Sequence, residues 1–588
     1  MRAAGAVPSA ASALDRAFGE VAPPEPGGVP DRVLLTAAAT GPDRAPDLPG
    51  AEPFPAAVAP DYSPARALLR AAEQHPSRAS LVDGATDRVW SVAESADAVA
   101  RLAGALRGRG LGASSRIAVV AQNSPWHFLI HVAASWIRAA TVPMSPRAPA
   151  PRLREMLEAA AVDLVVVDEA GAAALADGAG VPVGPMPSAP GAEPMPNGER
   201  GSAEGTAPAP GEVHPPIRDA GAPVVAVSDI EEWSRLAPAP AGPPLPCAQE
   251  EAAVVFTSGS TGLPRPVRLS HAALWWASAC FRDGFEYSPG SHVVGVCAPL
   301  SHIGGFNGTT LDTFSHGGTL VVVGPSFDPV RTLECVQRHR IAMMFVVPTM
   351  ARALLEANES VGADLSSWVR PLVGGDALTP ALAERMRRAG LAPIHVWGMT
   401  ETGGAGAMAA PDSHAPAGSI GRPFPYVDLR IVGADGAAAG PGALGTIEVR
   451  GPGVVTGQEW LSTGDLGFVD ADGWVHLVGR AHRMINTGGE LVAPPRVEAA
   501  LMELEEVREA LVVGVPDETW GEVVGAVLVP SPGADAASLS PASLAASLGG
   551  ALAPWERVRR VRLVDALPLT ATGKPSPAAA RELLLSGE

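Results

Sequence analysis

The chain has 588 residues, which is too many for one hydrophobic core, so at least two domains are expected. Its formal net charge of -19 argues against a general nucleic-acid or anionic-membrane binder, because both need a basic surface. The amino terminus lacks the pattern of a secretory signal, and no apolar run approaches the length of about 20 residues that a membrane span needs. The sequence therefore predicts a cytoplasmic globular protein.

Two segments are rich in Pro, Gly and Ala and have no apolar period. Residues 1–60 are predicted to form a disordered tail, and residues 176–220 a disordered insertion. Strand signals resume on both sides of the second segment, so it is interpreted as an insertion and not as a domain boundary.

Between these segments, helical and strand patterns alternate. Ser91 and Glu94 have the spacing of a capping box at the start of a helix. Short apolar runs predict buried strands at Ile117–Ala121, Leu164–Val167, Val254–Phe256, Val293–Cys297, Leu320–Val323 and Met344–Val347. Such alternation is typical of an α/β fold with parallel sheets. We expect a large N-terminal domain at 61–479 and a smaller α+β domain at 480–588, with strands at Ala510–Gly514 and Val524–Val529.

The cysteines show no spacing of a metal site or of a disulfide framework. Cys247, Cys280, Cys297 and Cys335 lie far apart in the sequence. We therefore expect reduced thiols that lie mostly in the core.

A phosphate-binding loop is indicated after the predicted strand that ends at Phe256. The loop consists of Thr257, Ser258, Gly259, Ser260, Thr261 and Gly262. Its hydroxyls and unhindered backbone N–H groups suit the oxygens of a triphosphate, although the spacing is not that of a Walker loop. The structural alternative is a flexible Ser/Gly linker.

Three further segments carry side chains that suit a nucleotide site. In 395–404, Trp397 offers a flat face for a base, Thr400 a hydroxyl, and Glu401 a carboxylate for Mg²⁺. The alternative there is a core tryptophan beside a solvated glutamate. In 461–490, Asp465 follows a predicted tight Thr-Gly turn and has acceptors for ribose hydroxyls. A β-hairpin over 465–478 is compatible with that role.

The fourth segment, 568–575, is a loop near the carboxyl terminus that carries Lys574. This is the only lysine of the chain, and every other basic Lys/Arg position is an arginine. A strong bias against lysine gives an ordinary explanation for Arg265, but it makes a chance placement of the single lysine in this loop harder to accept.

Taken together and in this order, the four segments resemble the motifs of the adenylate-forming superfamily. That superfamily contains acyl-CoA ligases, adenylation domains of peptide synthetases and firefly-type luciferases. The resemblance covers roughly residues 65 to 580, and "WIRAATVPMSP", "APLSHIGGF" and "VGGDAL" add weaker matches. It implies the fold already expected from the patterns, with a C-terminal domain that is mobile.

The resemblance also implies the site residues. ATP binding is expected for Thr257, Ser258, Gly259, Ser260, Thr261, Gly262, Arg265, Gly375, Asp376, Ala377, Trp397, Gly398, Thr400, Asp465 and Arg480. Within this set, Arg265 and the following Pro266 replace a lysine and a glycine of the family pattern. Arg265 retains a positive charge for the phosphates.

Catalytic, metal, hinge and acceptor residues follow from the same resemblance. The catalytic residues implied are Lys574, Thr400 and His302, with Glu401 as the Mg²⁺ ligand, His482 as the hinge and Gly489 in the coenzyme A tunnel. Lys574 would bridge the substrate carboxylate and the α-phosphate. For His302, contact with the carboxylate and capping of a turn remain equal alternatives.

The resemblance thus implies an enzyme that uses MgATP to convert a carboxylic acid into an acyl-adenylate and then passes the acyl group to coenzyme A. An aryl or fatty acid is favoured over an amino acid, because the segment after His302 has no acidic residue before Asp312. Gly304, Gly305 and Gly308 leave room for an acyl group or mark turns. A carrier protein or an amine as acceptor, a degenerate nucleotide- or acyl-binding relative, and an oxidoreductase of the luciferase branch remain alternatives.

Overall fold

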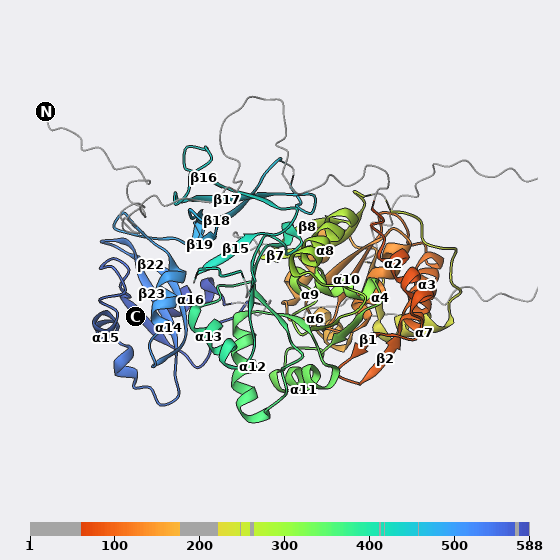
Figure 1. Ribbon diagram of the computed structural model, residues 1–588, viewed down its shortest axis with the longest axis horizontal. Helices are drawn as coiled ribbons and strands as arrows, with labels where there is room; N and C mark the ends of the chain where they lie inside the picture. Colours follow the sequence, from red (N-terminus) through yellow and green to blue (C-terminus); the bar gives the residue numbers. More distant parts are fainter. Residues whose placement is uncertain are drawn as a thin grey trace, which may run out of the picture.

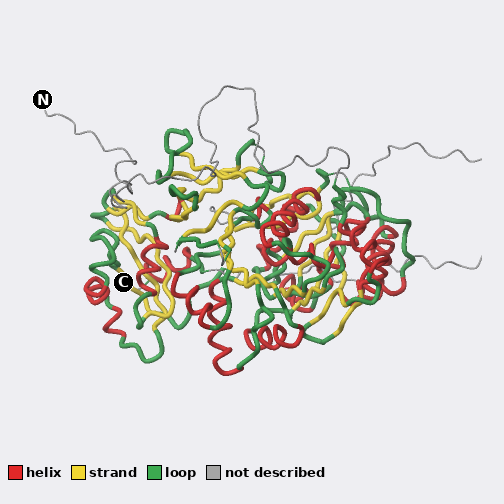
Figure 2. The backbone as a smooth tube through the Cα atoms, in the orientation of Figure 1, coloured by secondary structure: helices red, strands yellow, loops and turns green. Residues whose placement is uncertain are grey.

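The structure, a computed structural model, describes residues 60–176, 222–246, 248–258, 264–410, 413–416, 418–456, 458–570 and 575–586. The predicted tail and insertion lie outside these ranges except for residues at their edges, so the structure does not test them. Figure 1 shows the C-terminal strands and helices at one end of the molecule and the helices nearest the amino terminus at the other. Figure 2 shows that strands run through both parts.

A six-stranded sheet forms one layer of the large domain. Its order is β6 (Val224–Ala226), β5 (Leu164–Val167), β3 (Arg116–Val120), β4 (Ala140–Met144), β7 (Glu251–Ser258) and β8 (Pro264–Ser270). The first five strands are parallel neighbours, and β8 returns antiparallel to β7. All of β5 is buried, and alternate residues of it join different core clusters. This pattern is that of a parallel strand covered on both faces.

A thirteen-stranded sheet forms the larger layer. It contains β1 (Ala79–Asp83), β2 (Arg88–Ser91), β9 (Val293–Val296), β10 (Thr319–Val322), β11 (Met343–Val346), β12 (Arg370–Gly374), β13 (Ile394–Trp397), β14 (Ala407–Ala409), β15 (Ser419–Pro423), β16 (Asp428–Val432), β17 (Gly445–Arg450), β18 (Leu461–Val469) and β19 (Val475–Arg480). Strands β1, β10, β9, β11, β12 and β13 are parallel neighbours, and antiparallel strands extend the sheet beyond β13. The carboxyl ends of the parallel strands therefore share one edge.

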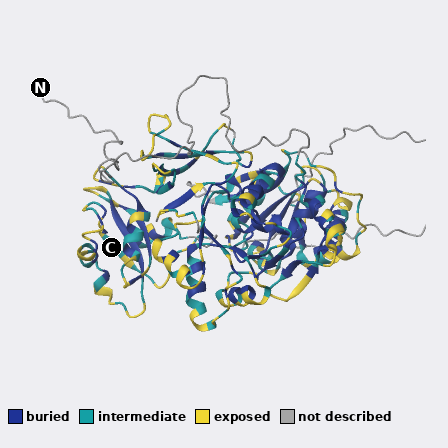
Figure 3. Cartoon of the chain, in the orientation of Figure 1, coloured by how far each residue is buried: buried dark blue, intermediate teal, exposed yellow. Residues whose placement is uncertain are grey.

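Helices cover the sheets of the large domain. They are α2 (Pro64–Gln74), α3 (Val92–Gly108), α4 (Trp126–Trp136), α5 (Ala150–Ala160), α6 (Glu169–Ala176), α7 (Val227–Leu236), α8 (His271–Phe285), α9 (Ile303–Phe306), α10 (Thr309–Ser315), α11 (Pro329–His339), α12 (Pro348–Val361) and α13 (Pro380–Arg388), with short 3-10 helices η1 (Thr400–Thr402) and η2 (Ala481–Arg483). The predicted capping box of α3 is present, because the side chains of Ser91 and Glu94 each accept the other residue's backbone N–H. Helix α4 is buried on all sides, and Figure 3 shows the buried interior around it.

The C-terminal domain is a smaller α+β unit. It contains β20 (Ile485–Thr487), β21 (Glu490–Val492), β22 (Val507–Asp517), β23 (Gly521–Pro530), β24 (Arg560–Leu563), α14 (Pro494–Met502), η3 (Ala536–Leu539), α15 (Pro541–Ser547) and α16 (Pro577–Leu585). Alternate residues of β22 join two clusters on opposite faces of the sheet. Helices α14 and α16 both contact β22.

The predicted fold class is confirmed, since a large domain with parallel sheets precedes a smaller α+β domain. One local prediction is wrong. Asp465 does not follow a tight turn, because Thr463 and Gly464 continue strand β18, with Gly464 at φ +73° and an irregular register opposite them. Glycine tolerates this left-handed conformation, so the strand bulges without ending.

Cys280, Cys297 and Cys335 are free and buried, as predicted, whereas Cys247 lies outside the described residues. Burial raises the pKa of Cys280 and Cys297 to about 12 and that of Cys335 to about 11. Within the described ranges, no helix is both long enough and apolar enough to cross a membrane.

Candidate active site

A cleft of about 1980 Å³ lies between the large domain and the C-terminal domain, and residues of both line it. It brings together most of the site residues expected from the sequence: Thr257, Arg265, His302, Gly375, Asp376, Ala377, Trp397, Gly398, Thr400, Glu401, Asp465, Arg480 and His482. These residues come from segments far apart in the chain, which the two sheets carry to one place. A cleft at a domain interface is a common position for a ligand site.

Strands β7 and β8 carry the two ends of the predicted phosphate loop to the cleft. Thr257 and Arg265 are paired across these strands, and the Thr257 hydroxyl donates to the Arg265 carbonyl oxygen over 3.4 Å. Arg265 is exposed and lines the cleft, where its charge is available to phosphate oxygens. Residues 259–263 lie outside the described residues, so the positions expected for Gly259, Ser260, Thr261 and Gly262 are not tested.

Asp465 is held by two side chains from other strands. Nε of Arg480 on β19 lies 2.6 Å from Oδ1 of Asp465, and the indole Nε1 of Trp397 on β13 donates to Oδ2 over 3.1 Å. Only 3% of Asp465 is exposed. Each carboxylate oxygen retains a second lone pair, so the group can still accept hydrogen bonds from a ligand. One side of the indole is covered, since a Cβ at Gly406 would lie 2.5 Å from its ring atoms.

Burial and neighbouring charges shift the pKa values of Asp465 and His482. Burial raises the pKa of Asp465, while the charge of Arg480 and the hydrogen bond from Trp397 lower it in part. Loss of solvent also lowers the pKa of His482, and the charges of Arg480 and Arg483 lower it further. His482 is therefore mainly neutral near pH 7, and Arg480 supplies the positive charge next to the carboxylate.

Thr400 and Glu401 lie in η1, just beyond the carboxyl end of β13. The Val455 N–H donates to the Glu401 carbonyl oxygen over 2.7 Å, which holds this turn in place. Gly403 ends the turn at φ +62°, and a Cβ there would lie 2.4 Å from Cβ of Ala277. Among the described residues, no basic side chain forms an ion pair with Glu401. Its carboxylate thus fits the oxygen-ligand chemistry of Mg²⁺.

Gly375, Asp376 and Ala377 follow β12 at the same sheet edge. Gly375 has φ +82°, and Oδ1 of Asp376 accepts the N–H of Ala377 over 2.8 Å, so the loop is held by its own side chain. Ligands of open α/β sheets bind outside the carboxyl ends of the strands, and this loop occupies that position.

The segment around His302 forms another wall of the cleft. His302 is the N-cap residue of α9, where its side chain makes no cap hydrogen bond. Gly304 and Gly305 line the cleft, whereas Gly308 does not. Gly308 instead has φ +71° and lies against the ring of Phe281. Asp312 also lies away from the cleft lining, where it accepts a hydrogen bond from the Tyr287 hydroxyl at 2.8 Å.

Among the described site residues expected from the sequence, Gly489 does not line the cleft. Gly489 lies in the exposed turn between β20 and β21, where a Cβ would meet no atom within 4 Å. Lys574 lies outside the described residues, but Thr570 and Pro575 on either side of 571–574 both line the cleft.

Sequence reasoning missed Glu498 on α14, which lines the cleft from the C-terminal domain. Its Oε1 accepts the Val512 N–H over 2.9 Å, and Arg483 lies 3.7 Å away. Burial raises the pKa of Glu498 to about 7, and the charge of Asp376 in the large domain adds to the shift. No sequence motif marks Glu498, because its burial and its neighbours Val512, Arg483 and Asp376 are set by the folded chain.

Comparisons with known proteins agree with this architecture. Residues 68–457 match the family model of AMP-binding enzymes, and residues 496–574 match that of the AMP-binding enzyme C-terminal domain. An indoleacetate–CoA ligase of Aromatoleum aromaticum is 36% identical over 56% of this chain and 67% of its own length. A feruloyl-CoA synthase of an Amycolatopsis species is 35% identical over 56% and 70%. A fatty acid–[acyl-carrier-protein] ligase of Streptomyces coeruleorubidus is 28% identical over 81% and 88%.

Solved structures show the same fold. The o-succinylbenzoate coenzyme A synthetase of Bacillus subtilis, in complex with ATP and magnesium ion, has a TM-score of 0.71 at 22% identity, covering 88% of this chain and 99% of that one. An anthranilate CoA ligase in complex with anthranoyl-AMP has a TM-score of 0.77 at 20% identity, covering 90% and 98%.

A cleft between a large α/β domain and a small α+β domain, together with the two family models, places the chain among enzymes that activate a substrate with a nucleotide. The chain belongs to the AMP-binding enzyme family and is an AMP-forming acid–thiol ligase. The predictions of the family, the fold class and the enzyme class are confirmed.

Proposed function

We propose that this chain uses MgATP to convert an aryl or fatty carboxylic acid into an acyl-adenylate and then transfers the acyl group to coenzyme A. The observation that carries the proposal is the cleft itself. It collects Thr400, Glu401, Asp465 and Arg480 from the large domain and receives the segments flanking Lys574 from the C-terminal domain.

In the first step, a carboxylate oxygen of the acid attacks the α-phosphorus of ATP. A new P–O bond forms, the bond to the β-phosphate oxygen breaks, and pyrophosphate leaves with the bonding electrons. Asp465 and Arg480 hold the ribose, and Thr400, Arg265 and Lys574 contact the phosphates or the carboxylate. Glu401 holds Mg²⁺, which supplies positive charge to the phosphate oxygens. The protein contributes positioning and charge neutralisation, and no covalent intermediate with a side chain is needed.

In the second step, the thiol sulfur of coenzyme A attacks the acyl carbonyl carbon. A C–S bond forms, the C–O bond to AMP breaks, and the thiol proton passes to solvent. Rotation of the C-terminal domain about His482 brings Gly489 to the cleft for this step. The exposed position of Gly489, outside the cleft lining, supports the need for such a rotation.

The class of acid is supported by the cleft walls and by the relatives. Gly304 and Gly305 line the cleft, and the Asp312 carboxylate, which an ammonium group would need, is outside it and paired with Tyr287. The names of two relatives contain aryl acids, indoleacetate and ferulate. Both observations favour an acid without an α-ammonium group.

The test is pyrophosphate release from MgATP across a panel of aryl, short, medium and long-chain acids, followed by thioester formation with coenzyme A. Acid-dependent release that is lost in Lys574→Ala supports the proposal. Tight ATP binding without release for any acid supports the degenerate binding protein instead. Release without a coenzyme A thioester points to another acceptor. A carrier protein is then the first to try, because one relative acts on an acyl carrier protein.

A further inference from the structure

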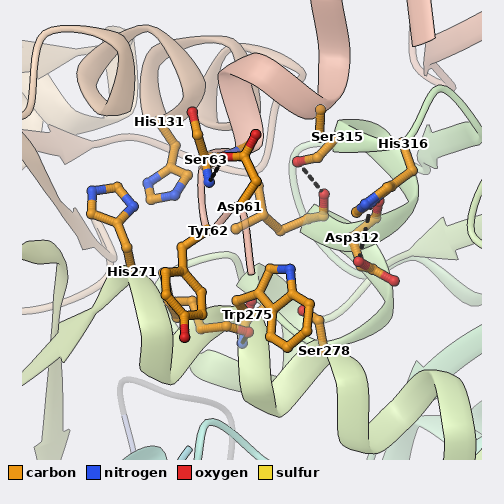
Figure 4. A pocket seen from close by; sticks show the side chains of 15 residues that line it. Asp61, Tyr62, Ser63, His131, His271, Trp275, Ser278, Asp312, Ser315 and His316 are labelled. Carbon is orange, nitrogen blue, oxygen red and sulfur yellow. Dashed lines mark hydrogen bonds and ion pairs between the residues drawn. The ribbon is translucent and has the colours of Figure 1, made fainter. Parts of the chain in front are cut away.

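A small pocket of about 40 Å³ lies beside the candidate active-site cleft. Its lining includes Asn307, between α9 and α10. It also includes His131 from α4, His271 and Trp275 from α8, and Tyr62, which are labelled in Figure 4. Asn307 lines both this pocket and the cleft. The pocket is therefore adjacent to the wall of the cleft that the segment around His302 forms.

Three buried polar atoms at this pocket have no hydrogen-bond partner in the described part of the chain. They are Nε2 of His131, Nε2 of His271 and Oδ1 of Asn307. The three residues are only 1%, 2% and 3% exposed, so bulk water does not satisfy these atoms. Nearly all buried polar groups in native proteins are hydrogen-bonded, and three exceptions around one cavity indicate a place for a ligand group.

The other polar atoms of His131 and Asn307 hold these two side chains in orientation. Nδ1 of His131 lies 2.7 Å from Oγ1 of Thr141, and its ring meets the ring of Phe306 edge to face at 4.8 Å. Nδ2 of Asn307 donates to the Leu274 carbonyl oxygen over 3.4 Å. Because these contacts use the other polar atom of His131 and of Asn307, the unpaired atoms of these two residues have fixed positions.

His131 and His271 are uncharged at neutral pH. Burial lowers the pKa of His131 to about 3 and that of His271 to about 4, so both imidazoles are neutral at pH 7. The Nε2 atom of a neutral imidazole either donates or accepts, and the amide oxygen of Asn307 accepts. A hydroxyl group, which donates one hydrogen bond and accepts others, matches this combination.

A charged group would find no free counter-charge at the pocket. The nearest carboxylates in its lining are already paired: Asp312 with Arg282 at 3.6 Å and His316 at 3.2 Å, and Asp61 with Arg66 and Arg70. Transfer of an unpaired charge into such a site is costly, whereas an uncharged polar group needs only its hydrogen bonds.

We propose that this pocket binds a hydroxyl group at the end of the substrate acid remote from its carboxylate. His131, His271 and Asn307 thereby select hydroxylated acids over the same acids without the hydroxyl. The pocket has room for a hydroxyl or a water but not for a whole acyl group, so only the end of the substrate enters it. This inference rests on the proposed function.

The test compares matched pairs of acids in the pyrophosphate-release assay. The pairs are benzoate and 4-hydroxybenzoate, phenylacetate and 4-hydroxyphenylacetate, cinnamate and 4-hydroxycinnamate, and octanoate and 8-hydroxyoctanoate, which place the hydroxyl at different distances from the carboxylate. For at least one pair, kcat/KM for the hydroxylated acid should be about 10-fold to 100-fold higher than for the acid without the hydroxyl. The acid without the hydroxyl leaves the buried polar atoms of the pocket unpaired.

Substitutions of the pocket histidines test whether the preference for hydroxylated acids comes from the pocket. In His131→Leu and His271→Leu, the ratio of kcat/KM within that pair should fall towards one. The ratio is measured within one protein sample, so a loss of folded enzyme does not change it. His127→Leu is the matched control, because His127 is equally buried on α4 but does not line the pocket, and there the ratio should keep its wild-type value.

The outcomes separate this inference from the proposed function. If acids are activated but no pair shows a preference, the pocket holds a water only and the inference is wrong. A preference that survives both histidine variants also overturns it. If no acid supports pyrophosphate release, the proposed function fails, and the inference that rests on it fails with it.

Discussion

The indole Nε1 of Trp397 donates a hydrogen bond to Oδ2 of Asp465 over 3.1 Å, although 68 residues separate them in the chain. Oδ1 of the same carboxylate lies 2.6 Å from Nε of Arg480. The carboxylate is thus fixed by strands on two sides at the edge of the cleft. A preorganised acceptor of this kind binds a ligand hydroxyl without an entropic cost of ordering at the time of binding.

Asp465→Asn should raise the KM for ATP by about 10-fold to 100-fold, because a hydrogen bond to a charged group contributes about 1.5–3 kcal/mol. The measurement is the ATP dependence of acid-driven pyrophosphate release. Asp470→Asn is the control on the same hairpin, since Asp470 pairs with His476 at 2.8 Å and does not line the cleft. An unchanged KM in Asp465→Asn would contradict the ribose-binding role.

Lys574→Ala should lower acid-dependent pyrophosphate release about 10²-fold to 10³-fold, the effect of removing one donor that stabilises transition-state charge. Thioester formation from preformed acyl-adenylate should persist, because Lys574 is proposed to act only in the first step. Lys574→Arg retains the charge and should recover part of the activity. Equal losses of pyrophosphate release and of thioester formation would contradict a role of Lys574 in the first step alone.

His482→Pro should retain pyrophosphate release and lose thioester formation, because proline restricts φ at the position proposed as the hinge. Single-turnover assays of each half-reaction separate the two effects. His482→Ala leaves φ free and should keep both steps. A hinge at another residue would be indicated if the proline variant formed thioester at the wild-type rate.

Gly304→Ala should narrow the cleft next to the acyl group. A Cβ at Gly304 would lie 2.9 Å from the ring of Phe345, so that ring must move. We expect kcat/KM for bulky aryl acids to fall about 10-fold more than that for acetate, since overpacking costs about 1–3 kcal/mol. Gly108→Ala is the control, because a Cβ there meets no atom within 4 Å. Equal effects on all acids would show that Gly304 does not set the acyl space.

The buried Glu498 should make stability depend on pH. Its folded-state pKa of about 7 lies above the ordinary value of 4.5, so the folded protein binds the proton more tightly than the unfolded chain. Stability from this group is therefore present below pH 4.5 and is lost as the pH rises to about 7, by an amount on the order of 3 kcal/mol.

Glu498→Gln removes this ionisation and retains an oxygen for the Val512 N–H. The apparent Tm of the variant should exceed that of the wild type at pH 8, and the difference should shrink towards pH 5. Asp376→Asn removes a neighbouring negative charge that helps to raise the pKa of Glu498. In the otherwise wild-type protein, this variant should lose less stability as the pH rises. A pH-independent difference between wild type and Glu498→Gln would contradict the assignment.

Features that depend on residues close together in the sequence could be predicted from the sequence. The apolar run Leu164–Val167 is strand β5 as predicted, and the Ser91–Glu94 capping box begins α3. The order of the motifs indicated the family, because each motif is a short contiguous segment whose residue types carry its chemistry. Local propensity and periodicity act over a few residues, so a single sequence expresses them directly.

Features that depend on which strands become neighbours required the tertiary structure. The contact of Trp397 with Asp465 arises because β13, β15, β18 and β19 belong to one sheet. The pKa of Glu498 is raised by burial in the folded chain, and Asp376 of the large domain adds to the shift. The pocket formed by His131, His271 and Asn307 likewise joins three distant segments. The sequence by itself determined the family, many of the local elements and the types of side chain proposed for the site. Strand order and domain contact decided which side chains meet and how far each is buried, because burial and electrostatic environment are properties of the assembled chain.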